Sequence, residues 1–215
     1  MLFNQWLLVL GTAAVLLMVG YFIKLIRSKN NWIKIVTFTG PSGAGKTTII
    51  GELLKKHPRW KMVLSLTSRE SRGGDLPGEY RCNVSRKEFL RIRKEKRDLW
   101  IESVHGNMYA TLKVDVVNAL LSEGLSLMNL MPVSVRKIRA YASGQVRSIF
   151  ILPPSEKELR RRLVKRGELP EQIDKRIADC KKWEEEARLS DIPYEFVKND
   201  GTVEEAVERV ERIID

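Results

Sequence analysis

A glycine-rich loop between a predicted strand and a predicted helix is the feature that most restricts how this chain can fold. The run Ile33–Thr39 is rich in β-branched residues, which is typical of a buried strand. The next nine residues read GPSGAGKTT, and apolar residues at helical spacing follow from Ile49. This is the pattern G-x-x-x-x-G-K-[ST] in the strand–loop–helix setting that it requires. We therefore predict a loop whose backbone amides bind phosphate.

Two side chains of this loop have predicted roles in binding a nucleoside triphosphate. Lys46 is expected to reach the β- and γ-phosphates, and the hydroxyl of Thr47 is expected to ligate Mg²⁺. The glycines let the backbone turn inward around the anion, and the N-terminus of the helix adds its partial positive charge. The predicted nucleotide-binding residues of the loop are Gly40, Pro41, Ser42, Gly43, Ala44, Gly45, Lys46, Thr47 and Thr48.

Strand and helix patterns alternate through the rest of the chain, as an α/β sheet requires. Further strands are predicted at 62–66, 125–130, 148–152 and 194–197, and helices at 114–121, 133–141, 156–166, 171–189 and 203–214. Ser155, with Glu158 three residues later, forms a capping box that begins a helix. A phosphate-binding loop at the first strand–helix turn favours a doubly wound parallel sheet, with ligands at the carboxyl ends of its strands.

The first 23 residues contain no charged side chain. The run Trp6–Ile23 is long enough and apolar enough to span the hydrocarbon core of a bilayer as a helix. Lys24 and Arg27 follow the run and no positive charge precedes it, which places the C-terminal side in the cytoplasm. A cleaved signal peptide has the opposite order of charge, so a retained anchor over 1–27 is favoured over cleavage. We expect a single-pass membrane protein with a cytoplasmic domain over 28–215.

The balance of charge and the residue counts exclude some kinds of site. Lys and Arg outnumber Asp and Glu by 38 to 27, which gives a formal net charge of +11. Such a charge suits nucleic acid or an anionic membrane surface. The densest basic run, 86–97, has Phe89, Leu90 and Ile92 at helical spacing, so we interpret it as a solvated helix and disfavour nucleic acid as a partner. Two cysteines and two histidines exclude a disulfide framework and a histidine-built metal centre.

Five sequence blocks between Ile33 and Ile214 carry a resemblance to a known family. They are GPSGAGKTT, LTSRESRGGDLPGEY, VHGNMYATLK, SIFILPPSEKELRRRLVKRG and the segment that begins at Asn199. In this order they resemble guanylate kinase. The resemblance implies an ATP- and Mg²⁺-dependent phosphotransferase that acts on a nucleoside monophosphate, with GMP as the default acceptor. It also implies an inserted monophosphate-binding subdomain over about 67–113 and a lid over about 166–180.

The resemblance also implies roles for individual residues. Arg69 and Arg72 match arginines that grip the phosphate of the acceptor, a task that suits the paired donors of a guanidinium group. Arg166 and Arg176 match the lid arginines, and Arg162 is their neighbour. The implied monophosphate-binding residues are Arg69, Arg72, Tyr80, Tyr109 and Thr111; the implied catalytic residues are Lys46, Arg69, Arg166 and Arg176; and Asn199 is implied on the adenine side of the ATP site.

The sequence departs from the family pattern where the base is bound. Trp100 stands where the family has a glutamate that holds the guanine edge, and we expect Glu102 on the other side of the strand. Asn129 and Met131 stand where the family has two aspartates, one that reads the base and one associated with the metal. Trp100 either stacks on a base or belongs to the core. The resemblance therefore implies that the phosphate-binding residues are kept and that the guanine-binding carboxylates are absent.

Three functions remain open from the sequence. The first is a membrane-anchored nucleoside-monophosphate kinase whose base specificity is unresolved. The second is a non-catalytic module that binds a partner at the membrane, although the complete phosphate-binding loop favours catalysis. The third is a P-loop kinase for another phosphorylated acceptor, which would keep the phosphate-binding arginines and explain the absent carboxylates.

Overall fold

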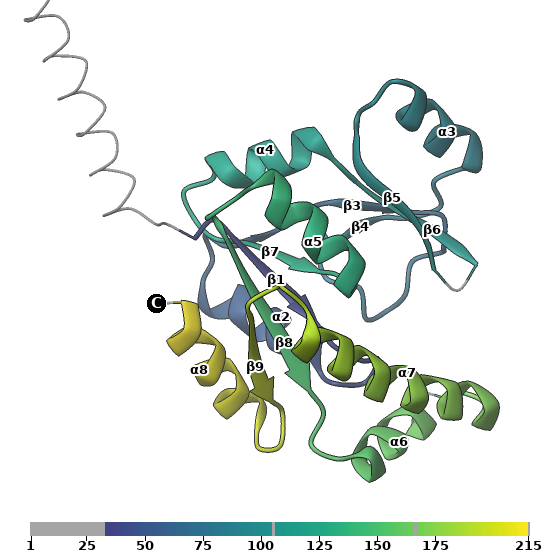
Figure 1. Cartoon of the computed structure of the whole chain (residues 1–215), viewed down its shortest axis with the longest axis vertical. Coiled ribbons are helices and arrows are strands. Elements are labelled where there is room, and N and C mark those ends of the chain that lie inside the picture. Colours follow the sequence, from purple (N-terminus) through teal and green to yellow (C-terminus); the bar gives the residue numbers. More distant parts are fainter. Residues whose placement is uncertain (1–32, 105, 166, 215) are drawn as a thin grey trace, which may run out of the picture. The chain divides into compact units, whose positions relative to one another are not determined.

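The computed structural model describes residues 33–104, 106–165 and 167–214, and the strands of its central sheet run parallel (Figure 1). The strand order is β2-β7-β1-β8-β9. The bounds are Ile35–Thr39 for β1, Lys61–Met62 for β2, Ser126–Asn129 for β7, Val146–Leu152 for β8 and Tyr194–Lys198 for β9. Every residue of β1 is buried, which explains its uninterrupted β-branched and aromatic run. The predicted α/β fold with a parallel sheet is confirmed.

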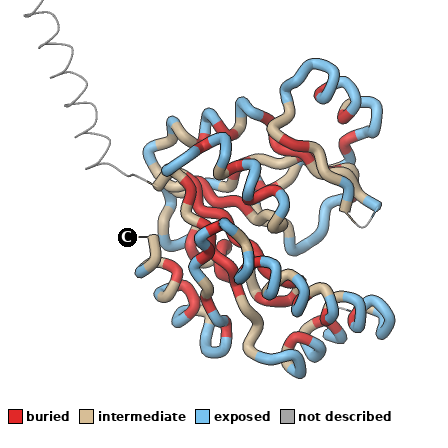
Figure 2. Tube along the Cα trace, viewed as in Figure 1, coloured by how far each residue is buried: buried red, intermediate tan, exposed pale blue. Residues whose placement is uncertain are grey.

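Helices cover both faces of the central sheet, whose buried strands are red in Figure 2. The helices in contact with it are α2 (Lys46–Lys56), α8 (Val203–Ile214), α4 (Lys113–Leu121) and α5 (Pro132–Tyr141). Leu127 and Met128 are neighbours in β7, yet they point to opposite faces because side chains alternate along a strand. Leu127 packs in a cluster with α2 and α8, and Met128 packs in a cluster with α4 and α5.

A second sheet lies between β2 and α4 in the chain, with the strand order β4-β3-β6-β5. Its strands are β3 (Ser65–Thr67), β4 (Tyr80–Arg81), β5 (Asp98–Val104) and β6 (Asn107–Leu112). The prediction of a single strand at 62–66 is wrong, because Met62 ends β2 of the central sheet and Ser65 begins β3 of this one. A short apolar run shows that residues are buried but does not show which strand they pair with.

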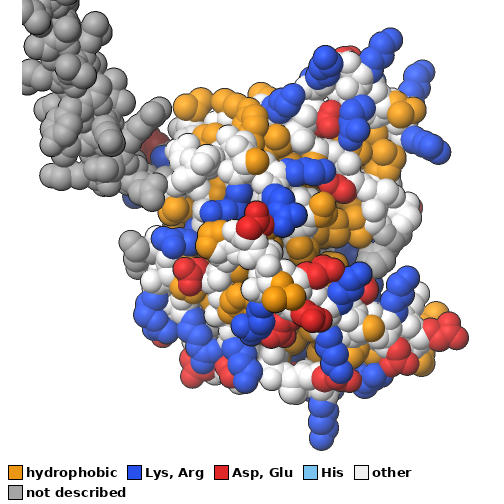
Figure 3. Space-filling view, in the orientation of Figure 1, with side chains coloured by type: hydrophobic (Ala, Val, Ile, Leu, Met, Phe, Trp, Pro, Cys, Tyr) orange, Lys and Arg blue, Asp and Glu red, His pale blue; other side chains and the backbone are white. Residues whose placement is uncertain are grey.

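The helix predicted within the basic run is α3 (Arg86–Lys94), and it packs on one face of the second sheet. Phe89 and Ile92 are buried against that face, and the Ser85 hydroxyl caps the helix by accepting from the backbone N–H of Glu88. Lys and Arg side chains gather on the exposed side of α3 (Figure 3). The basic run is therefore a solvated helix surface, as its spacing predicted.

The opposite face of the second sheet carries mostly polar side chains. Backbone pairing aligns Tyr80, Ser65, Thr111 and Trp100 in one row across the four strands, and Thr67, Tyr109 and Glu102 in the next. Both rows lie on the same face, because residues two apart along a strand point the same way.

Two further helices, α6 (Glu156–Lys165) and α7 (Pro170–Leu189), pack against each other. The predicted cap of α6 is present, since the Ser155 hydroxyl accepts from the backbone N–H of Glu158 at 3.1 Å. Arg166, the first predicted residue of the lid, lies outside the described residues.

The predicted anchor, residues 1–27, also lies outside the described residues. Over 33–104, 106–165 and 167–214, no helix combines the length and the apolar character that crossing a bilayer demands. The anchor stays a prediction from the sequence.

Candidate active site

The loop between β1 and α2 has the conformation of a phosphate-binding loop. Gly40 has φ +141°, and a Cβ there would lie 2.3 Å from the carbonyl oxygen of Ile151, so only glycine fits. Gly45 has φ +97° at the N-cap of α2. The ammonium of Lys46 donates to the carbonyl oxygens of Gly40 at 2.7 Å and of Pro41 at 2.9 Å. The Lys46 ammonium is thus held over the loop, where the oxygens of a phosphate would accept hydrogen bonds from it.

Two side chains brace this loop from outside. Asn199 is 6% exposed and its Nδ2 donates to the carbonyl oxygen of Ala44 at 2.7 Å. Arg162 of α6 donates from Nη1 to the carbonyl oxygen of Gly43 at 3.4 Å. Its Nε also donates to Glu158, and hydrogen bonds from Arg161 and Arg162 lower the pKa of Glu158 to about 2. Asn199 supports the loop in this structure, and its predicted contact with adenine stays a prediction.

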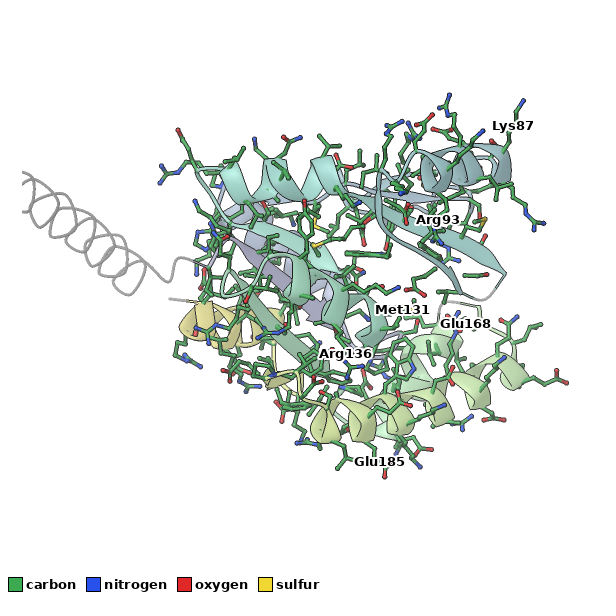
Figure 4. All side chains as sticks on the ribbon, turned by 45° about the horizontal axis from the view of Figure 1, so that its top comes forward. Lys87, Arg93, Met131, Arg136, Glu168 and Glu185 are labelled. Atoms are coloured by element: carbon green, nitrogen blue, oxygen red, sulfur yellow. The ribbon has the colours of Figure 1, made fainter. Side chains whose placement is uncertain are left out.

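A cleft of about 900 Å³ extends from this loop to the polar face of the second sheet. Met131, at the start of α5, and Glu168, between α6 and α7, lie on its wall and are labelled in Figure 4. The predicted site residues that line the cleft are Gly40, Ser42, Gly43, Gly45, Lys46, Thr47, Thr48, Arg69, Arg72, Tyr80, Tyr109, Thr111 and Arg176. Pro41, Ala44 and Asn199 are not among the lining residues. The structure thus brings the loop and the predicted acceptor residues to one cavity.

Arg69, one of the predicted phosphate-binding residues, is held rigidly in the wall of the cleft. It is 8% exposed, and its guanidinium donates two hydrogen bonds to the carboxylate of Asp75, at 2.6 and 2.8 Å. The hydrogen bonds to Asp75 raise the pKa of Arg69 above its ordinary value. Burial alone would raise the pKa of Asp75, but hydrogen bonds from Arg69 and from the backbone of Arg72 outweigh it and lower that pKa. Sequence reasoning missed Asp75, whose signal was an acid six residues after Arg69.

Two tyrosines stand beside this arginine. Tyr80 lies under the Arg69 guanidinium, with 4.7 Å from the guanidinium carbon to the ring centroid, and meets Tyr109 edge-on at 6.1 Å. Burial raises the pKa of Tyr80, with a smaller contribution from the nearby Glu79, so its hydroxyl is a neutral donor. In the same row, the hydroxyls of Thr111 and Ser65 are 3.0 Å apart. Ser65 lines the cleft and was missed from the sequence.

The residues that replace the family's base-binding carboxylates also line the cleft, but they differ in chemistry. Trp100 is 3% exposed and packs in the core with Met128 and Ile138, so the core interpretation of this residue holds. The expectation that Glu102 lies on the other side of the strand is wrong, because residues two apart share a face. Its carboxylate is paired with the ammonium of Lys137 from α5.

Arg176 of α7 reaches the cleft from the predicted lid. Its Nε lies 2.6 Å from a carboxylate oxygen of Glu168, which also lines the cleft. Glu168 and Trp183 were missed from the sequence, since nothing in their local pattern distinguishes them from surface residues of a charged helix pair.

The residues around the loop fit Mg²⁺ that arrives with a nucleotide. No group of three or more His, Cys, Asp or Glu able to hold a metal by itself occurs in the described part of the chain. Mg²⁺ usually keeps several waters and binds through one or two protein oxygens together with substrate phosphates. Thr47, Glu79 and Asn129 supply oxygen atoms along the cleft. This donor set suits a metal held jointly by protein and phosphate.

Comparisons with known proteins agree with this geometry. The family model described as guanylate kinase matches residues 33–215. The guanylate kinase of Clostridium perfringens strain SM101 is 36% identical over 188 residues, covering 86% of this chain and 84% of that protein. The guanylate kinase of Synechocystis sp. is 32% identical over 183 residues, covering 84% and 93%.

A solved structure extends the comparison to three dimensions. The crystal structure of guanylate kinase from Anaplasma phagocytophilum aligns with a TM-score of 0.64 at 25% identity, over 85% of this chain and 84% of that chain. A phosphate-binding loop, a buried arginine clamp and this similarity over most of the sequence lead to one assignment. The chain belongs to the guanylate kinase family and is a phosphotransferase that uses ATP as co-substrate and Mg²⁺ as cofactor.

Proposed function

We propose that this protein transfers the γ-phosphoryl group of ATP to a nucleoside monophosphate, with GMP as the default acceptor. The observation that carries the proposal is a single cleft that joins the phosphate-binding loop to the Arg69–Asp75 pair. A kinase needs two phosphorylated molecules in one water-excluded pocket, with cations placed around the transferred group. The names of the similar proteins make GMP the first acceptor to test.

The residues of this chain divide the work between them. Lys46 moves its ammonium from the loop carbonyls to the β- and γ-phosphates, and Thr47 offers its hydroxyl to Mg²⁺, which neutralises charge on the phosphates when bound. Arg69, already fixed by Asp75, donates N–H hydrogen bonds from its guanidinium to the phosphate of the acceptor. Arg176, and Arg166 by resemblance, close over the polyphosphate from the lid and exclude water.

A coupled assay of ATP consumption tests this function. The full chain, solubilised in mild detergent, is assayed with GMP, AMP, CMP and UMP as acceptors in the presence of Mg²⁺. We expect turnover with GMP, and less with the other three. A folded protein that turns over none of the four monophosphates contradicts the proposal.

One observation favours a second acceptor class. Trp100, Asn129 and Met131 line the cleft with a core side chain, an amide and a thioether at the positions where the resemblance implies carboxylates. Without carboxylates that accept hydrogen bonds from the base, a pocket discriminates less well for guanine, because selectivity depends on polar groups of the site that only the correct ligand satisfies. A phosphorylated acceptor other than a nucleotide is therefore the second candidate. Adding sugar phosphates to the same assay distinguishes the two classes.

We also propose that the phosphotransferase is anchored in a membrane by residues 1–27, with its domain in the cytoplasm. The support is the uncharged N-terminal run followed by Lys24 and Arg27. Fractionation of cells that express the full chain tests this proposal. We expect the protein in the membrane fraction after extraction with alkaline carbonate, and release into the supernatant would contradict the anchor.

A further inference from the structure

The strand next to the phosphate-binding loop ends in an amide. β7 pairs in parallel with β1, Asn129 is aligned with Phe38, and the backbone N–H of Leu130 donates to the Phe38 carbonyl oxygen at 2.9 Å. Asn129 is therefore close to the start of the loop at Gly40. P-loop enzymes hold Mg²⁺ with the hydroxyl of the loop and with an aspartate carboxylate. From Asn129 to Met131, at the end of β7, this chain has no charged side chain.

A carboxylate from the second sheet contacts that amide. The Nδ2 of Asn129 donates to Oε1 of Glu79 at 3.1 Å. Glu79 directly precedes β4, is 4% exposed, and lines the same cleft as Thr47 and Asn129. Its second oxygen, Oε2, accepts from the backbone N–H of Leu76 at 3.1 Å. Glu79 thus brings a negative charge to the place where the end of β7 has none.

Glu79 differs from the other acids that line the cleft. Each of those acids has a basic partner: Asp75 pairs with Arg69, Glu102 with Lys137 and Glu168 with Arg176. Within the described residues, the ion pairs include none with Glu79, whose partners are neutral donors. A buried carboxylate with neutral partners has lost hydration without gaining a cation, which favours a bound cation beside it.

We propose that Glu79 supplies the carboxylate of the Mg²⁺ site, in place of an acid at the end of β7. The inference rests on nucleotide binding by the loop and requires no particular acceptor. Thr47 lies in α2, which packs on the central sheet, whereas Glu79 directly precedes β4 of the second sheet. Binding of the metal therefore holds the second sheet against the central sheet. A variant without this carboxylate loses affinity for the metal and keeps its affinity for the nucleotide.

Binding of Mn²⁺, followed by electron paramagnetic resonance, tests this inference on the full chain saturated with a non-hydrolysable ATP analogue. We expect Glu79→Gln to weaken the Mn²⁺ affinity of this complex by about 10- to 100-fold, the usual effect of losing a supporting ligand. The affinity for the analogue without metal, measured by calorimetry in EDTA, should be unchanged. Neither measurement uses an acceptor, so failure of this inference is distinct from failure of the proposed kinase activity.

Two further variants make the result specific. Glu102→Gln removes a carboxylate of the same cleft that Lys137 already neutralises, and it should leave the Mn²⁺ affinity unchanged. The double variant Glu79→Gln with Asn129→Asp moves the carboxylate to the end of β7, and it should recover most of the lost affinity.

Three outcomes overturn the inference: unchanged Mn²⁺ affinity in Glu79→Gln, equal losses with and without metal, or no recovery in the double variant. Thermal unfolding monitors the fold of each variant. If Glu79→Gln does not fold, Glu79→Asp, which keeps the charge and shortens its reach, must show the same selective loss of Mn²⁺ affinity.

Discussion

The two ends of the cleft are built in different ways. At the phosphate end, charged groups are fixed by short contacts: Lys46 by two loop carbonyls, and Arg69 by both carboxylate oxygens of Asp75. At the far end, Trp100 belongs to the core and Met131 has no charge, while Glu102 is already neutralised by Lys137.

This contrast shows which part of a kinase tolerates change. Every phosphorylated ligand presents the same anionic oxygens, so the phosphate end needs the same few cations whatever the acceptor. The organic part of the phosphoryl acceptor is recognised by hydrogen-bonding side chains that match one chemical group. Those side chains can differ between proteins without affecting phosphoryl transfer. The predictions below test the two ends separately, from the largest expected effect to the smallest.

Replacement of Lys46 tests the phosphate end most severely. Lys46→Ala should lower kcat by about a thousand-fold, because it removes a preorganised cation from the transferred group. Steady-state kinetics measure the loss. Lys55→Ala is the matched control, since Lys55 lies on the same helix, is exposed and pairs with Glu52. Activity of Lys46→Ala close to that of the control would mean that the loop does not serve catalysis.

At the far end, we expect the largest effect from replacement of Trp100, and we expect it in the free energy of unfolding. Trp100→Ala should lower the free energy of unfolding by about 3–5 kcal/mol, because it leaves a cavity in the core beside Met128 and Ile138. Urea denaturation measures this difference. Val104→Ala, in the same strand and lining the same cleft, should cost less because its side chain is only half-buried. A stable Trp100→Ala with weaker acceptor binding would indicate a stacking residue instead.

Replacement of Arg69 tests whether this arginine binds the phosphate of the acceptor and not ATP. Arg69→Met should lower kcat/KM for the acceptor by about 100-fold, because a bidentate phosphate contact is lost, whereas KM for ATP should stay nearly constant. Arg97→Met, at an exposed loop position where the side chain pairs with Glu95, is the control. An equal effect on both substrates would break the proposed division of the cleft.

The Arg69–Asp75 pair should make the free energy of unfolding depend on pH. The folded protein lowers the pKa of Asp75, so the pair stabilises the fold above the unfolded pKa of about 3.9 and loses that contribution as the pH falls through the folded value. Asp75→Asn should cost about 1.5–3 kcal/mol at pH 7, as expected for a hydrogen bond to a charged group. The difference between the two proteins in free energy of unfolding should shrink as the pH falls below about 4, and it should vanish below the folded pKa of Asp75. A difference that persists at lower pH would assign the stability to another contact.

Met131 offers the mildest change and acts at the far end. It is the N-cap of α5 and makes no side-chain cap hydrogen bond. Met131→Asp should stabilise the protein by about 0.5–2 kcal/mol through a new cap, and should raise the preference for GMP over AMP by adding a carboxylate to the cleft. Thermal unfolding and competition kinetics measure the two effects. Stabilisation without a change in preference would place base recognition elsewhere in the cleft.

Much of the phosphate end could be predicted from the sequence, because its signals are local. The loop from Gly40 to Thr48 follows a fixed spacing, and the resemblance to guanylate kinase implied Arg69 and Arg72 as phosphate-binding residues. Asp75 was missed although it lies only six residues after Arg69, whereas Glu79 could not be predicted, since nothing in its own neighbourhood shows that it meets Asn129. The division of 62–66 between two sheets was missed for the same reason.

By itself, the sequence determined the parallel α/β architecture and the phosphate-binding loop. These properties depend on residue type and on periodicity within a few turns or one strand, which a linear pattern contains. The tertiary structure decided that Trp100 is core, that Glu102 faces the cleft and that Glu79 meets Asn129. Such contacts depend on strand register and on which sheets lie together, and both are set by packing between segments far apart in the chain.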